Sequence, residues 1–377
     1  MTIHTRDCPE KNQRDVCNLN HQEKIRVLDR DKKMIVNNSW YLAAWANEVT
    51  TSPLARRICN NPVVLYRTLE GKANALIDSC SHRGAPLSLG TVVENGIRCN
   101  YHGLVFGCSG ACVEIPNQEK IPPKARVDSF PMVEKDQMLW IWIGSPEKAD
   151  ESLIPDYPFH NDTKNWPHYH DVLPVKCHYI MLIDNLLDAT HLSYLHSASV
   201  GGSSPDVHMV AQNDLSTTDN GITLNRFMQN SPPPETYNNC VALPERIDRW
   251  QEFEFVAPST VIQYSGGVPT GEDRKSAGAP RFDMRIFHTL TPETDTSCFY
   301  FWSVANGHDT DNPAATKTIT EEIQVALAED KAMVEAQQLR ITELGEERLA
   351  NNAADRPRVL ARNAIKKLSE RQNPETG

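Results

Sequence analysis

A short segment in the middle of the chain carries residues that could bind a metal ion. It runs Asn185-Leu-Leu-Asp188-Ala-Thr-His191-Leu-Ser-Tyr-Leu-His196, with two histidines five residues apart and a carboxylate just upstream. Neutral imidazole binds iron, zinc or copper, and two histidines plus one carboxylate with open positions are typical of non-haem Fe(II) sites. Residues five apart lie about 140° apart on an ideal helix, so the pair requires a helix end or widened turn between them. The segment alone also allows two buried histidines on an amphipathic helix without metal.

A second group of possible ligands lies upstream on two short turns. The turns are Cys80-Ser-His82-Arg-Gly and Cys99-Asn-Tyr-His102-Gly, each with one thiol, one imidazole and a nearby glycine. Two cysteines and two histidines are the ligand set of a Rieske [2Fe-2S] cluster, in which imidazoles replace two thiolates on one iron. Zinc motifs usually pair the cysteines on one turn and the histidines on the other. The mixed pairing therefore favours the cluster over zinc.

The two motifs together resemble the oxygenase components of Rieske non-haem iron oxygenases. Cys-x-His, sixteen residues and Cys-x-x-His are followed downstream by Asn-x-x-Asp-x-x-His-x4-His. The segments at residues 38–45, 83–90 and 101–107 look like the vanillate O-demethylase branch of that family, which includes dicamba-type demethylases. The resemblance extends over about residues 34 to 350 and is closest around the first motif.

This resemblance implies a division of labour between two iron centres and a partner protein. A separate reductase, with or without a ferredoxin, would deliver electrons from NADH or NADPH to a cluster held by Cys80, His82, Cys99 and His102. The cluster would pass the electrons to mononuclear Fe(II), where O2 and the substrate react. The expected assembly is a head-to-tail homotrimer, in which the cluster of one subunit serves the iron of the next.

The resemblance also assigns roles within the downstream motif. His191 and His196 are the expected iron ligands. Asp188 would bridge a cluster histidine of one subunit to an iron-binding histidine of its neighbour. Asn185 would lie close to the iron without being a tight ligand.

The third iron ligand should be a carboxylate far downstream. Thr318-Ile-Thr-Glu321 is typical of a capping box, after which Ile323, Leu327, Val334 and Ile341 share one helical stripe. Asp330 falls in that stripe, where an unpaired carboxylate would cost several kcal/mol to bury. It should therefore be displaced to the surface, paired or bound to metal. The family's third ligand lies in the matching Glu-Asp-Lys segment, so the resemblance also indicates Asp330.

The expected reaction follows from the resemblance alone. It implies a terminal oxygenase, a monooxygenase or dioxygenase acting on a small aromatic compound, with O-demethylation of a methoxy-aromatic acid first. Ring hydroxylation and dioxygenation of a diaryl ether are alternatives within the family. A Rieske electron carrier with a non-catalytic binding domain is an alternative of another class. Such carriers are short, so the long segment after the cluster motif disfavours that alternative.

One predicted strand carries candidate substrate contacts. Met284, Ile286 and His288 share a strand face by the period of two, presenting two apolar groups and one hydrogen-bonding group. That combination suits an aromatic compound with one polar substituent. In demethylases of the resembling branch, a histidine before Leu-Thr-Pro-Glu contacts the substrate's polar group. A half-buried structural histidine is the alternative.

The chain divides into three predicted segments of an α+β protein. Residues 1–33 are highly charged and have no apolar periodicity, which predicts a disordered extension, and Met34 is a candidate natural start. Residues 34–148 should form an antiparallel β Rieske domain, and residues 149–377 a catalytic domain with an antiparallel sheet covered by helices. Alternating runs predict strands at 61–66, 73–78, 96–99 and 138–143, and at 222–228, 251–256, 259–263, 282–288 and 298–303.

Composition excludes several functional classes. The net charge of −11 disfavours nucleic-acid binding, and no apolar run is long enough to span a bilayer. The first 33 residues are too charged to hold a secretory signal. Ten cysteines in 377 residues are too dilute for a disulfide scaffold. These features predict a cytoplasmic protein without a membrane partner.

Overall fold

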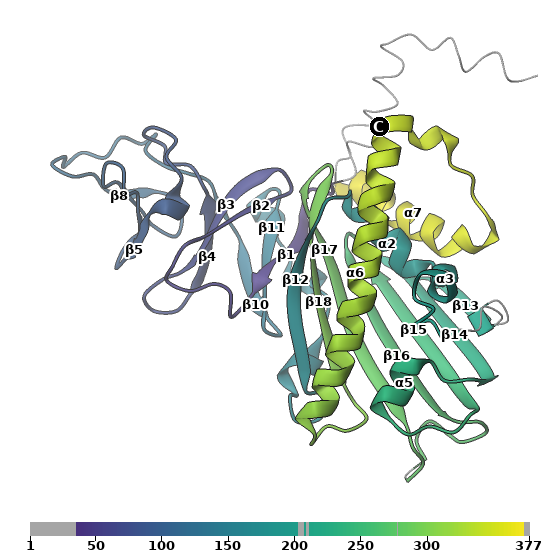
Figure 1. The fold of residues 1–377 in the computed structure, drawn as a ribbon. Coiled ribbons are helices and arrows are strands. Elements are labelled where there is room, and N and C mark those ends of the chain that lie inside the picture. The colour runs from purple at the N-terminus through teal and green to yellow at the C-terminus, as the bar shows by residue number, and fades with distance from the viewer. Residues whose placement is uncertain (1–34, 203–206, 209–210, 277, 373–377) are drawn as a thin grey trace, which may run out of the picture. The chain divides into compact units, whose positions relative to one another are not determined.

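The computed structural model describes residues 35–202, 207–208, 211–276 and 278–372 (Figure 1). The predicted extension at residues 1–33 and the candidate start at Met34 lie outside these residues. Small sheets come first along the described chain, and one large sheet with helices follows. In the described part of the chain, no helix is both long and apolar enough to cross a membrane.

Three small antiparallel sheets make up the first half. One sheet has the order β1 (Ser39–Trp45), β11 (Met138–Ile143), β10 (Met132–Lys135). Another has the order β2 (Leu54–Ile58), β3 (Asn61–Arg67), β4 (Ala73–Ile77), β9 (Ser129–Phe130). The remaining one has the order β5 (Thr91–Val93), β6 (Gly96–Arg98), β7 (Val105–Phe106), β8 (Cys112–Glu114). The predicted strands are confirmed to within one residue in β3, β4, β6 and β11.

One seven-stranded antiparallel sheet dominates the second half. Its order is β12 (His168–Val175), β18 (Ser297–Asn306), β17 (Phe282–Thr294), β16 (Thr260–Pro269), β15 (Ile247–Val256), β14 (Gly221–Ser231), β13 (Gln212–Thr217). The predicted antiparallel sheet is confirmed, with the five predicted strands as β14 to β18. Edge strand β13 escaped prediction because Gln-Asn-Asp-Leu-Ser-Thr has one apolar residue and no alternation.

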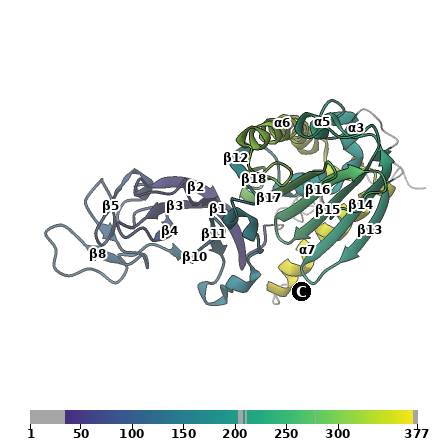
Figure 2. The ribbon, with the colours of Figure 1, turned by 90° about the horizontal axis from the view of Figure 1, so that it is seen from below.

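Helices cover this sheet. They are α2 (Tyr179–Leu187), α3 (Leu192–Leu195), α5 (Glu235–Cys240), α6 (Pro313–Leu344) and α7 (Arg356–Gln372). Helix α6 contacts β12 and β18, α2 contacts β17 and α6, and α7 contacts β14 and α2. Figure 2 shows α3, α5 and α6 on the same face of the sheet. Single-turn 3-10 helices are η1 (Leu87–Leu89), η2 (Pro146–Lys148), η3 (Glu151–Leu153), η4 (Pro158–Asn161), η5 (Ala189–His191), η6 (Glu346–Arg348) and η7 (Ala353–Asp355).

The predicted start of helix α6 is wrong. The Thr318–Glu321 segment lies inside the helix, which begins at Pro313 after the cap Asn312. The Asn312 side chain accepts a hydrogen bond from the backbone N–H of Ala314 at 3.0 Å. Asparagine at the cap and proline at the first helical position form a stronger start signal than a Thr-x-x-Glu pattern. The stripe around Asp330 is unaffected, because it lies farther along the same helix.

A tryptophan-rich core lies where the β1–β11 sheet meets the large sheet. Trp45, Trp140 and Trp142 are almost fully buried, and they cluster with Phe287 and Phe301 from β17 and β18. The indole N–H of Trp45 donates to the backbone carbonyl of Asp171 in β12 at 3.0 Å. Removing one such ring would cost about 3–5 kcal/mol. This core fixes the strands that carry the candidate site.

Candidate metal centres and substrate pocket

A helix end separates the two histidines of the downstream motif. Helix α2 stops before Asp188, the one-turn helix η5 ends at His191, and α3 ends before His196. The predicted break between the histidines is confirmed, and it sets their ring centroids 5.1 Å apart. A 3-10 turn followed by an α-helical turn thus replaces one regular α-helix, on which the two imidazole rings would point in different directions.

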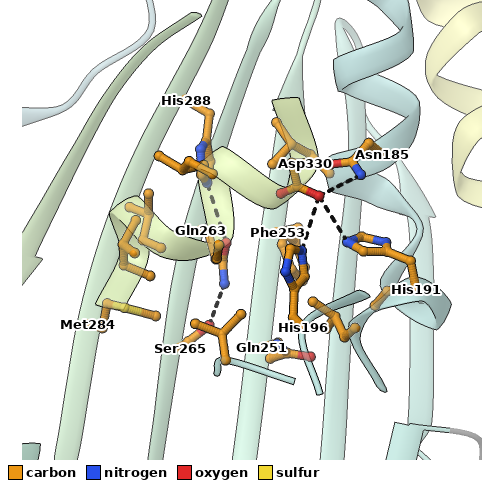
Figure 3. Close-up of a pocket in the computed structure, with 18 of the residues that line it drawn as sticks. Asn185, His191, His196, Gln251, Phe253, Gln263, Ser265, Met284, His288 and Asp330 are labelled. Carbon is orange, nitrogen blue, oxygen red and sulfur yellow. Dashed lines mark hydrogen bonds and ion pairs between the residues drawn. The ribbon is translucent and has the colours of Figure 1, made fainter. Parts of the chain in front are cut away.

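Asp330 completes the group from helix α6. Its side chain is buried, and one carboxylate oxygen lies 3.1 Å from His196 Nε2 and 3.6 Å from His191 Nε2. One ligand atom from each of the three residues lies within 4.8 Å of the others. Figure 3 shows the three side chains converging on one point. Ile323, Leu327 and Val334 of the predicted stripe are buried, before and after Asp330 along the helix.

The second ring nitrogen of each histidine is already occupied. His191 Nδ1 bonds the backbone carbonyl of Asp188, and His196 Nδ1 lies 2.7 Å from Glu329 Oε2. Because each Nδ1–H donates to its acceptor, the proton stays on Nδ1 and both Nε2 lone pairs are left for a metal. Partners of this kind orient metal-binding imidazoles and raise their basicity.

The predicted contact between the Asp188 carboxylate and His191 is wrong. That carboxylate accepts instead from Thr190, at 2.9 Å from the backbone nitrogen and 2.6 Å from the hydroxyl. Asp188 follows the last turn of α2 and is the N-cap of η5, so its side chain accepts a hydrogen bond from a free backbone N–H at the start of η5. The backbone carbonyl of Asp188 has no partner within the helix, so it accepts the hydrogen bond from His191 Nδ1.

The two histidines differ in their electrostatic surroundings. Burial lowers the pKa of His191, and the charge of Asp330 offsets this only in part. Burial also acts to lower the pKa of His196, but its bonds to Asp330 and Glu329 outweigh it, so that pKa is raised. Without a cation, the carboxylates therefore favour a proton on His196. A bound dication would take that proton's place.

Asn185 supplies a further polar group at the same point. Its amide nitrogen donates to the Asp330 oxygen at 2.9 Å. Its amide oxygen is buried and has no hydrogen-bond partner among the described residues. Two imidazole nitrogens and one carboxylate form the donor set that mononuclear Fe(II) takes in oxygenases, and the Asn185 oxygen lies beside them. The residues present therefore fit iron.

The upstream motif forms two matching turns. The N–H of Gly84 bonds the carbonyl of Cys80 at 2.8 Å, and the N–H of Gly103 bonds that of Cys99 at 2.9 Å. Both glycines have positive φ, which side-chain-bearing residues rarely adopt. Burial raises the pKa of the Cys80 thiol, and the neighbouring Cys99 thiol raises it further. The thiols therefore lie together on the buried side of the turns.

The histidines of this motif lie on the outer side. His82 and His102 are exposed, and their ring centroids are 4.5 Å apart. A pair of buried thiols beside a pair of exposed imidazoles fits the two irons of a Rieske cluster, one held by sulfur and the other by nitrogen.

An apolar pocket opens beside His191, His196 and Asp330. Its walls include Phe253 and Leu327, from β15 and α6. Met284, Ile286 and His288 line the pocket from one face of β17, as their spacing predicted. Figure 3 shows Met284 and His288 on a strand facing the metal ligands.

His288 is held as a neutral hydrogen-bonding group. Its Nδ1 accepts from the Tyr300 hydroxyl at 2.7 Å, and its Nε2 faces Gln263 Oε1 at 3.4 Å. Burial lowers its pKa to about 3. The amide nitrogen of Gln263 donates in turn to Ser265 at 2.8 Å.

Several pocket residues escaped the sequence reasoning. Glu329, the partner of His196, directly precedes Asp330, and this adjacency was the available signal. Gln251, Gln263 and Ser265 interrupt apolar strands β15 and β16, and they all line the pocket. A polar residue on a buried strand face could have been identified, but its position relative to the metal depends on strand pairing.

Two family profiles cover the chain. Residues 39–131 match the Rieske [2Fe-2S] domain, and residues 175–371 match the vanillate O-demethylase oxygenase C-terminal domain. The toluene-4-sulfonate monooxygenase system iron-sulfur subunit of Comamonas testosteroni is 36% identical over 85% of this chain and 93% of its own length. The dicamba O-demethylase oxygenase component of Stenotrophomonas maltophilia is 32% identical over 89% of this chain and 98% of its own length.

Solved structures agree with the fold and with an iron centre. The crystal structure of dicamba monooxygenase bound to dicamba has a TM-score of 0.82 and 31% identity, covering 90% of this chain and 99% of that one. A structure of dicamba monooxygenase with non-heme iron and dicamba has a TM-score of 0.75 and 29% identity over the same shares. The α+β fold, a [2Fe-2S] cluster and a mononuclear iron are therefore confirmed as expected from the sequence. The chain belongs to the Rieske non-haem iron oxygenases, as the oxygenase component of a multicomponent system.

Proposed function

We propose that the enzyme removes the methyl group of a methoxy-aromatic acid, with His191, His196 and Asp330 binding the iron. The observation that carries this proposal is the buried group of two imidazoles and one carboxylate, which opens onto an apolar pocket. The demethylase named among the relatives supports the reaction type. When bound, the iron supplies the chemistry that activates O2 with electrons received through the cluster.

The chain's own residues bind and orient the substrate. Phe253, Ile286 and Leu327 exclude water and hold the aromatic ring. His288, neutral and positioned by Tyr300, would offer its Nε2–H, which otherwise faces Gln263 Oε1 at 3.4 Å, to an uncharged polar substituent. Oxygenation of the methyl carbon consumes two electrons and two protons and places the other oxygen atom in water. The resulting hemiacetal breaks its carbon–oxygen bond to give a phenol and formaldehyde.

A second candidate is hydroxylation of a methyl carbon on an aromatic sulfonate. The relative that acts in a toluene-4-sulfonate monooxygenase system favours it. The same pocket and the same iron ligands would serve, because both reactions begin at a methyl C–H bond. The products differ: a hydroxymethyl compound keeps its carbon, whereas a methoxy compound loses it as formaldehyde.

The electron path is part of the proposal. A separate NAD(P)H-dependent reductase would deliver electrons at the exposed edges of His82 and His102. We propose a homotrimer in which the half-buried Asp188 carboxylate meets the cluster histidine of a neighbouring subunit. Thiolate ligands suit a reducing compartment, which supports a cytoplasmic location.

Single-turnover product analysis tests the reaction. The chemically reduced protein would be exposed to O2 with 4-methoxybenzoate, vanillate or toluene-4-sulfonate. Formaldehyde from a methoxy acid supports the first candidate, and a hydroxymethyl product from the sulfonate supports the second. Ring-hydroxylated products with the methyl group intact would contradict both.

A further inference from the structure

A buried arginine beside the pocket has no carboxylate within ion-pair distance among the described residues. Only 1% of the Arg249 surface is exposed. Its Nε and one terminal nitrogen, Nη2, make no hydrogen bond within the described ranges. By contrast, Arg56, Arg281 and Arg362 each have a carboxylate within ion-pair distance.

Arg249 lies next to residues that line the substrate pocket. It shares a face of β15 with Gln251 and Phe253, two and four residues along, and both of these line the pocket. Its guanidinium carbon is 5.1 Å from the ring centroid of Tyr237, which also lines the pocket. The Tyr237 ring is held by stacking on Phe282, with centroids 3.9 Å apart.

A second buried arginine adds to the positive charge. Arg226 is 4% exposed, and among the described residues its guanidinium bonds uncharged groups, namely Gln251 Oε1 at 2.6 Å, the carbonyl of His208 at 3.2 Å and Asn213 Oδ1 at 3.2 Å. Burial and the charge of Arg249 lower the pKa of Arg226 to about 10, although Asp188 acts in the opposite direction. The two guanidiniums thus create a positive potential, and no carboxylate of the described residues forms an ion pair with either of them.

Burying two guanidinium cations without a counter-ion costs free energy, which a bound anion would offset. Buried charges in proteins are normally paired, and a guanidinium presents a planar fork that matches an oxyanion. The pocket residue His288 cannot supply positive charge for the anion, because it is buried and neutral. Gln251 supports anion binding beside Arg249: its oxygen is held by Arg226, which leaves its amide N–H groups as donors toward the pocket.

We propose that Arg249 binds the anionic group, sulfonate or carboxylate, of the aromatic substrate, while His288 serves an uncharged substituent. This inference rests on the proposed function, since it concerns the substrate of the same pocket. It makes Arg249 the residue that selects aromatic acids over neutral aromatic compounds. Sulfonate and carboxylate share the required chemistry, two or more oxygens carrying a delocalised negative charge.

Equilibrium binding tests the inference without turnover. The probes are toluene-4-sulfonate, 4-methylbenzoate and the neutral toluene-4-sulfonamide, titrated calorimetrically into the oxidised holoenzyme. We expect at least one anion to bind about 10- to 100-fold more tightly than the sulfonamide, as a charge-assisted hydrogen-bonded pair would give. Arg249→Met should remove that preference and leave sulfonamide binding unchanged.

Two further variants keep the test decisive. Arg249→Lys retains the charge without the fork, so it should lose only part of the preference, even if the methionine variant does not fold. Arg274→Met is the matched control, because Arg274 pairs with Glu252 and covers Trp250, on the opposite face of β15. It should leave all affinities unchanged.

The contradicting outcomes are equally definite. Equal affinity of the native enzyme for anionic and neutral probes would overturn the inference, as would a full preference in Arg249→Met or Arg249→Lys. Failure of the proposed oxygenation would appear separately, as absence of product from probes that still bind with the expected preference.

Discussion

The two ligand sets of this protein contrast in both exposure and sequence separation. The proposed cluster ligands come from two neighbouring turns within residues 80–102, and their histidines are exposed. The proposed mononuclear iron ligands come from segments 134 residues apart and converge beside a pocket. An exposed imidazole edge suits electron delivery from another protein, whereas a buried site excludes water from the oxygenation step. The same chain thus separates electron transfer from substrate chemistry by placing one centre on turns and the other between helices.

The largest effect should come from removing a ligand of the buried centre. His191→Ala, His196→Ala or Asp330→Ala should abolish product formation and remove the mononuclear iron, because each deletes one of three protein ligands. The cluster spectrum should remain, since its ligands lie elsewhere. Metal analysis and visible spectroscopy on one sample check both expectations. Full activity in Asp330→Ala would show that the third ligand is misassigned.

Removing a ligand of the exposed centre should give the opposite pattern. Cys80→Ser or His102→Ala should lose the visible colour and reductase-dependent turnover together. The matched control is Cys108→Ser, which changes an exposed thiol on a nearby turn. That control should keep both properties. Retained colour in the ligand variants, or stoichiometric zinc in the native protein, would argue against the cluster ligands.

Asp188 tests whether the two centres communicate. Asp188→Asn keeps the backbone carbonyl that orients His191, so most mononuclear iron and a reducible cluster should be retained. Turnover should fall by orders of magnitude, because the proposed route between subunits loses its charge. Cluster reoxidation by O2 in the presence of substrate measures this step.

Thr190→Val distinguishes the effect of the Asp188 charge from the effect of the local turn geometry. This substitution removes the hydroxyl that bonds the carboxylate but leaves the charge in place. Near-normal reoxidation is expected. If cluster reoxidation in Thr190→Val is as slow as in Asp188→Asn, the local turn geometry rather than the Asp188 charge controls electron transfer. A monomeric protein at working concentration would contradict the proposed electron route between subunits.

A smaller effect is expected at the pocket wall. His288→Ala should raise KM by about 10-fold, the worth of one hydrogen bond to substrate, and should uncouple O2 consumption from product. His288→Asn, which retains a donor, should recover part of the loss. Unchanged kinetics with a lowered Tm in both variants would make His288 a structural residue.

At the joint between the small sheets and the large one, stability rather than activity should change. His160 contacts Ser303 in β18 at 2.7 Å, and burial, helped by the charge of His168, lowers its pKa to about 3. The unfolded chain binds a proton below its ordinary pKa while the folded chain does not, so stability falls as pH drops. Between pH 7 and 5 the free energy of unfolding should fall by about 2 kcal/mol through this residue. Denaturant titrations of His160→Gln should show a correspondingly flatter profile, and an equal slope would contradict the assignment.

The sequence predicted those features that depend on local pattern. The cluster turns and the helix end between His191 and His196 are set by residues close in the chain, and both are found as expected. Asp330 was identified because a carboxylate in an apolar helical stripe is costly without a partner.

The features that escaped prediction depend on three-dimensional context. Whether the carbonyl or the carboxylate of Asp188 faces His191 depends on how α2 ends, which residue types do not specify. Helix α6 begins earlier than predicted because Asn312-Pro313 competes with a weaker capping pattern. The two unsatisfied nitrogens of Arg249 become evident only once the strands and helices around it are placed, because the sequence does not show which described side chains reach it.

Iron and acid-labile sulfide content per chain tests the presence of two separate centres most directly. The native protein should contain about three irons and two sulfides, a [2Fe-2S] cluster plus one mononuclear iron. Asp330→Ala should retain about two irons and two sulfides with an unchanged cluster spectrum. Two irons in the native protein, or loss of sulfide together with iron in Asp330→Ala, would contradict a separate mononuclear centre at His191, His196 and Asp330.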